Sequence, residues 1–110
     1  MNNSLQGRAV RICANEFFHQ DISAHVILAC EEDKKLLLKL DMVLSMAGVH
    51  YEYAVASPRL AKNSIDDLLN TGVLGSAVTW VPDTRFDANR PLDLSWWRGD
   101  AAAVTDVYLE

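Results

Sequence analysis

Residues 24–56 read AHVILACEEDKKLLLKLDMVLSMAGVHYEYAVA and carry the strongest pattern in the chain. The first seven residues form a nearly continuous apolar run, which is typical of a central strand covered on both faces. The acidic residues at 31–33 suit the positively polarised start of a helix, and Gly48 suits the left-handed position that ends one. We therefore predict a helix over residues 31–47, followed by an alternating strand over residues 51–56.

The expected helix has one broad apolar face, which should pack against a sheet. At helical spacing this face comprises Leu36, Leu37, Leu40, Val43, Leu44 and Ala47. Because the helix would connect the strands on either side of it, we expect those two strands to run parallel, with a right-handed crossover.

The rest of the chain predicts further strands and one short helix. Apolar alternation and short apolar runs predict strands over residues 8–14, 77–81 and 103–109. Ser64 and Asp67 resemble a capping box, and Gly72 would end the short helix that follows.

The predicted element order is therefore ββαβαββ. We expect an α+β domain of two or three layers, with two helices and a mixed sheet of about five strands. The length of the chain fits one domain over residues 1–110. Residues 1–7 should fray, and residues 83–100 should form a long irregular segment, a feature that is often functional in a compact domain.

Composition excludes several classes of function. The formal net charge is −5 and the basic residues are scattered, which argues against nucleic-acid binding. No apolar stretch is long enough to span a membrane, and the N-terminal residues do not resemble a secretory signal, so we expect a cytoplasmic protein. The two cysteines are expected to be reduced, buried thiols rather than a disulfide.

Few residues suggest a chemistry. Cys30 lies where a strand would meet a helix start, a place that can activate a thiolate, but the three acidic residues after it would raise its pKa. We therefore interpret Cys30 as structural. His19, His25 and His50 lack metal-ligand spacing, and no serine lies in a G-x-S-x-G elbow. We expect no metal and no cofactor, and we favour a protein that is not an enzyme.

Two groups of residues are candidates for contact with a partner. Leu38, Met42 and Met46 would form a second apolar stripe on the long helix, suited either to self-association or to cover by residues 83–100. Trp96, Trp97 and Arg98 are of the types that anchor binding hot spots, although they could instead pin their own segment to the core.

Three hypotheses of function remain open at this stage. The first is a non-enzymatic binding protein that acts as a homodimer through the stripe or the tryptophan segment. The second is a small-molecule binder or small enzyme, with a pocket lined by aromatic residues and one polar group. That pocket would be built from Trp80, Trp96, Tyr51 and Tyr53, with His50 or Glu52. The third is an acidic inhibitor, or immunity-like protein, that binds a larger protein.

Overall fold

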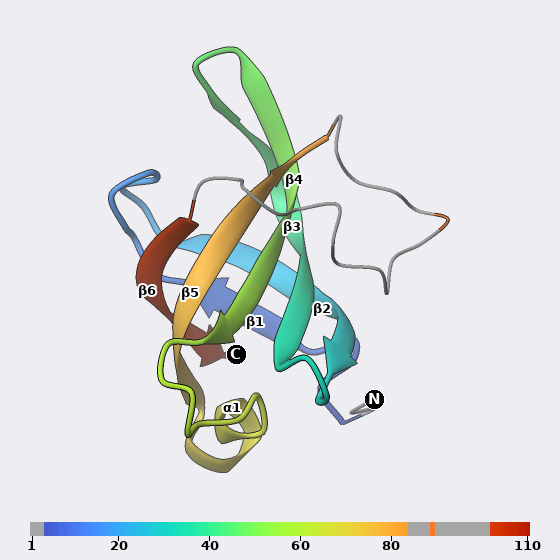
Figure 1. The fold of residues 1–110 in the computed structure, drawn as a ribbon. Coiled ribbons are helices and arrows are strands. Elements are labelled where there is room, and N and C mark those ends of the chain that lie inside the picture. Colours follow the sequence, from blue (N-terminus) through green and yellow to red (C-terminus); the bar gives the residue numbers. More distant parts are fainter. Residues whose placement is uncertain (1–3, 84–88, 90–101) are drawn as a thin grey trace.

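The computed structural model describes residues 4–83, 89 and 102–110, whose strands form a closed antiparallel barrel (Figure 1). The elements are β1 (Ala9–Ile12), β2 (Ile22–Cys30), β3 (Lys35–Met46), β4 (Val49–Pro58), α1 (Asp67–Thr71), β5 (Val73–Pro82) and β6 (Ala102–Leu109). Each strand pairs antiparallel with the next, and β6 returns to pair with β1. The predicted α+β architecture, with a mixed sheet and two helices, is therefore wrong.

The predicted helix over residues 31–47 is replaced by a turn and a strand. Residues 31–34 form the turn, in which Lys34 has a φ of 54° and its amide donates to the carbonyl of Glu31 at 3.2 Å. In β3 the buried side chains that face the barrel interior are Leu36, Leu38, Leu40 and Leu44. Every even position from 36 to 46 is apolar, and this alternation prevails because β2 and β4 supply a hydrogen-bonded neighbour on each side.

Gly48 joins two antiparallel strands rather than ending a helix. Ala47 has a φ of 52° and Gly48 a φ of 81°, so both central residues of the two-residue β3–β4 connection are left-handed. This is the pattern of a tight type I′ hairpin turn. The predicted right-handed crossover is also wrong, because β3 lies between β2 and β4 as their shared antiparallel neighbour.

Other local predictions agree with the structure. The short helix is confirmed as α1, and it ends at Gly72, which has a φ of 80° and donates its amide to the carbonyl of Leu68. The capping box is wrong in detail, since the N-cap is Asp66 and the Ser64 hydroxyl accepts the amide of Asp66 at 3.0 Å. Strands occur near all five predicted positions, and most are longer than predicted.

Apolar side chains fill the barrel interior. Among the described residues Trp80 is the largest fully buried side chain, and it lies opposite Ala54, whose small size leaves room for the indole ring. Phe18 packs edge-to-face against Trp80 at 4.8 Å and against Tyr51 at 6.2 Å between ring centroids. Because a six-stranded barrel is narrow, these rings fill it rather than line an open pocket.

Two N-terminal residues, Leu5 and Gly7, contact the barrel, and the fraying of residues 1–7 stays a prediction. Leu5 is fully buried in the core, and the amide of Gly7 donates to the carbonyl of Val26 at 2.7 Å. Most of the segment over residues 83–100 lies outside the described residues. Within the described part of the chain, no helix has the length and apolar character needed to cross a membrane.

Candidate functional site

The β3–β4 hairpin extends past the barrel, at the top of Figure 1. β2 pairs with β3 only as far as Leu40, whereas β3 continues to Met46. Among the described residues, the two strands of the tip pair with each other, from Leu44 opposite Tyr51 to Met46 opposite Val49. The tip also contacts the end of β5 at its base, where Pro82 lies opposite Tyr51. The tip is therefore not needed to close the barrel.

A large β-bulge separates this tip from the barrel. Between the pair Lys39–Tyr53 and the pair Leu44–Tyr51, residues 40–43 of β3 face a single residue of β4. Such a bulge bends the strand and redirects side chains. Met42 occupies an even position, like the inward-facing leucines, yet its side chain is 56% exposed. The bulge therefore turns Met42 toward solvent.

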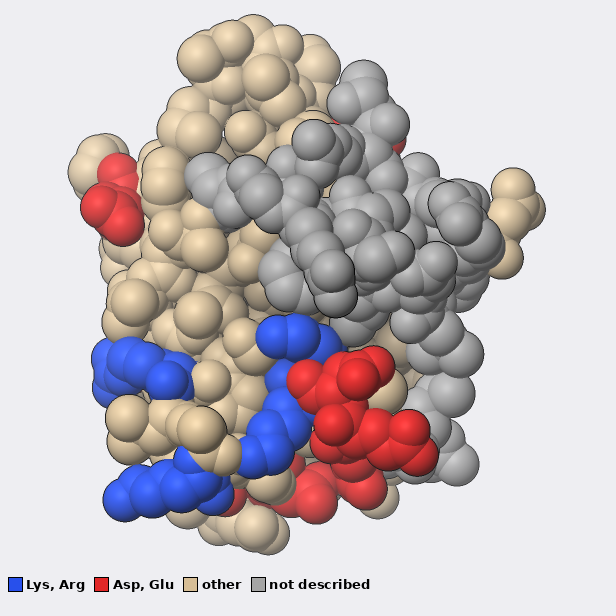
Figure 2. All heavy atoms as spheres, in the orientation of Figure 1, with Lys and Arg blue, Asp and Glu red and all other residues tan. Residues whose placement is uncertain are grey.

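The hairpin surface is apolar and uncharged. Residues 42–51 contain no Lys, Arg, Asp or Glu. Met42, Val43 and Val49 are 56%, 48% and 38% exposed. In Figure 2 the hairpin at the top carries no charged side chain, whereas charged groups gather over the lower part of the same face. Exposed apolar side chains grouped on a projection are typical of a contact surface.

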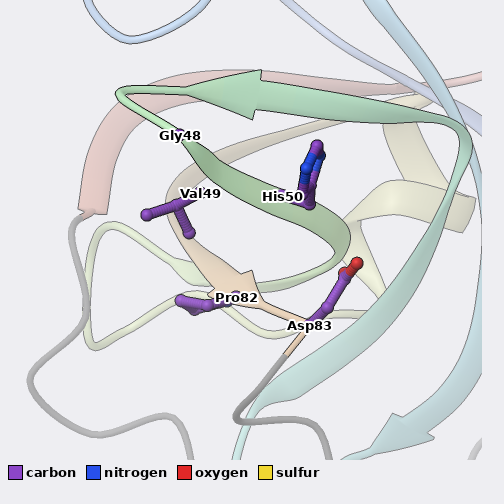
Figure 3. A pocket seen from close by; sticks show the side chains of 5 residues that line it. All are labelled: Gly48, Val49, His50, Pro82 and Asp83. Atoms are coloured by element: carbon purple, nitrogen blue, oxygen red, sulfur yellow. The ribbon is translucent and has the colours of Figure 1, made fainter.

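A shallow hollow of about 200 Å³ lies between the hairpin and the end of β5. It is lined by Gly48, Val49, His50, Pro82 and Asp83 (Figure 3). The amide of Asp83 donates to the carbonyl of His50 at 2.9 Å, which fixes the end of β5 against β4. The hollow is smaller than the usual 300–1,000 Å³ of small-molecule pockets.

One ring nitrogen of His50 has a hydrogen-bond partner among the described residues, and the other has none there. Its Nδ1 lies 2.8 Å from the hydroxyl of Ser45, the residue directly opposite it in the hairpin. Within the described residues no ion pair involves His50 or Asp83; the ion pairs there join Arg11 to Asp21 and His25 to Asp41. The hollow thus presents an imidazole and a carboxylate that are not paired with each other.

The Ser45–His50 contact has the geometry of a cross-strand pair. A hydrolytic triad also needs a carboxylate that orients the histidine, and none is hydrogen-bonded to His50 in the described part of the chain. No group of three or more His, Cys, Asp or Glu side chains that could hold a metal occurs among the described residues.

The aromatic residues chosen from the sequence do not form a pocket together. Trp80 and Tyr51 are buried in the core. Tyr53 belongs to a second apolar cluster, separate from that core, where Lys39 Nζ lies 4.9 Å from the centroid of its ring. Of the predicted pocket residues within the described part of the chain, His50 alone lines the hollow. Trp96, Trp97 and Arg98 lie outside the described residues.

The predicted stripe of Leu38, Met42 and Met46 is not one surface, because its helix does not exist. Leu38 is fully buried inside the barrel, and Met46 is half-buried against the core. Met42 is the member of the stripe that is exposed. A contact role for these residues can therefore involve Met42 directly, but not Leu38.

Neither cysteine lies at the start of a helix, the position that would activate a thiolate. Cys13 is half-buried, and burial, followed by the nearby charges of Asp21 and Asp106, raises its pKa, with a smaller opposing effect from Arg11. Cys30, also half-buried, precedes a turn rather than a helix, and its Sγ lies 3.5 Å from the carboxylate of Asp33.

Sequence reasoning missed Val43, Val49 and Asp83. The available signal was the uncharged stretch 42–51, with the Ala47-Gly48 turn at its centre. Comparison of the chain with protein families, with curated proteins and with solved structures finds no match. The hairpin and its hollow are therefore interpreted from their own residues.

Proposed function

We propose that the protein is a non-enzymatic binding protein that acts as a homodimer, with the β3–β4 hairpin as its contact element. The observation that supports this proposal is the uncharged hairpin that extends past the barrel and exposes Met42, Val43 and Val49. Burying such a surface against another protein removes apolar area from water, which is favourable by about 25 cal/mol per Å².

A second copy suits this surface better than the other partners considered. The chain carries a net charge of −5, so two copies repel each other unless they meet through a neutral region. Residues 42–51 supply such a region. The negative charge disfavours nucleic acid, and the small hollow and filled barrel disfavour a small-molecule pocket lined by Trp80 and Tyr51.

The mass of the protein in solution tests this proposal. We expect light scattering behind a sizing column to give about twice the chain mass of 12.2 kDa, and Met42→Lys or Val49→Lys to shift the protein toward monomer. Val104→Lys is the matched control, because Val104 is 61% exposed but lies on β6, in the barrel wall. A wild-type monomer at every concentration, or equal effects of all three variants, would contradict the proposal.

The proposal includes a cytoplasmic location, as the composition suggests. Cell fractionation with an antibody to the protein tests this part separately, and recovery with the membrane or secreted fractions would contradict it.

A further inference from the structure

From the hollow at the base of the hairpin tip, we infer how the two copies meet: His50 of each copy pairs with Asp83 of the other. This inference rests on the proposed homodimer and specifies its contact. It starts from the two polar groups of the hollow, which come from neighbouring strands and are not paired with each other in the described residues. Figure 3 shows both side chains rising on the same side of the two strands.

The contact between Ser45 and His50 allows His50 to donate to such a partner. When the Ser45 hydroxyl donates to Nδ1, the proton of the neutral imidazole lies on Nε2. Nε2–H is then a donor, and the Asp83 carboxylate is an acceptor that has no ion-pair partner among the described residues. One chain therefore presents one donor and one acceptor side by side.

Two-fold symmetry makes this arrangement self-complementary. In an isologous dimer, a contact from residue i to residue j of the second copy is repeated from j to i. One His50–Asp83 contact across the axis therefore implies a second. Val49 lines the same hollow and is partly exposed, so the two valines can meet near the axis between these polar pairs.

The size of the surface sets the expected affinity. A standard interface uses roughly 20–30 residues from each partner, whereas the hairpin tip with Pro82 and Asp83 supplies roughly a dozen. We therefore expect a dissociation constant in the micromolar range, which sedimentation equilibrium measures directly.

Exchanging the residues at positions 50 and 83 within one chain tests the pairing. His50→Asp alone places carboxylates on both sides of each contact, and Asp83→His alone removes the acceptor, so each should raise the dissociation constant at least tenfold. The double variant His50→Asp with Asp83→His keeps complementary groups in a two-fold dimer and should restore the constant to within about threefold of wild type. Thermal melts followed by circular dichroism verify that each variant is folded.

His19→Asp is the matched control, because it makes the same change of residue type at an exposed histidine between β1 and β2, outside the hollow. It should leave the dissociation constant within about threefold of wild type. If the double variant stays monomeric, or if His19→Asp weakens the dimer as strongly as His50→Asp, the pairing is wrong. If Val49→Lys dissociates the dimer but His50→Asp does not, the homodimer stands and this contact fails. A wild-type monomer overturns both.

Discussion

Leu38→Ala is the substitution that best separates the barrel from the helix predicted by the same sequence. In the barrel Leu38 is fully buried on β3, between its cross-strand partners Val26 and Ala54. Because backbone ladders hold both partners, they cannot move in to fill the space left by the isobutyl group. Buried Leu→Ala substitutions cost about 2–5 kcal/mol, and we expect about 3 kcal/mol here. On an exposed stripe the same change would cost well under 1 kcal/mol.

Urea unfolding followed by circular dichroism measures this cost. Val104→Ala is the matched control, because the valine is exposed on a strand of the same barrel, and we expect it to cost about 0.5 kcal/mol. The total stability of a domain is about 5–15 kcal/mol, so the loss at Leu38 should lower the urea concentration at the midpoint of unfolding measurably. The dependence of the unfolding free energy on urea concentration should not change. If the two variants lose the same stability within about 1 kcal/mol, Leu38 does not face the interior of a barrel.

Two further substitutions test local features of the fold. Ala47→Asn should raise the free energy of unfolding by about 0.5–1 kcal/mol, because Ala47 has a φ of 52° and asparagine tolerates that region better; a loss of stability in urea unfolding would contradict the type I′ turn. Trp80→Phe should change stability by no more than about 1 kcal/mol, because the lost packing is offset by removing a buried indole N–H that has no hydrogen-bond acceptor in the described part of the chain. A loss above about 3 kcal/mol, measured by the same method, would show that this N–H has an acceptor.

The short elements could be predicted from the sequence because their signals are local. Gly72 ends α1 as expected, and the strands near β1, β2, β4, β5 and β6 follow from apolar runs and alternation. The long element could not, because its leucines fit two periods at once. Residues 36, 40 and 44 are four apart and also lie on one face of a strand. At a period of two, every even position from 36 to 46 is apolar. The choice between the two periods depends on pairing with β2 and β4, which lie outside the element itself.

The choice of period also determined which contact residues could be foreseen. On a helix, Leu38 and Met42 share a surface, whereas in β3 the bulge over residues 40–43 turns Met42 outward and leaves Leu38 inside. A bulge depends on how two strands align, so no local pattern announces it. Asp83 could not be placed beside His50 for the same reason, since the two residues meet only when β4 and β5 pair.

The lengths of the strands give an independent reason to look for function at the hairpin. β1 needs only Ala9–Ile12 to close the barrel against β2 and β6, whereas β3 spans Lys35–Met46 and continues beyond its pairing with β2. Closure therefore does not account for the tip, and the core accounts for only part of it. Leu44 and Tyr51 are buried in the core, whereas Val43 and Val49 are exposed. A neutral apolar projection on a free protein favours aggregation unless it is covered. A second copy that contacts the tip through the hollow would cover Val49 and give both His50 and Asp83 a hydrogen-bond partner. One symmetric contact would then account for the apolar tip and for the two polar groups beside it.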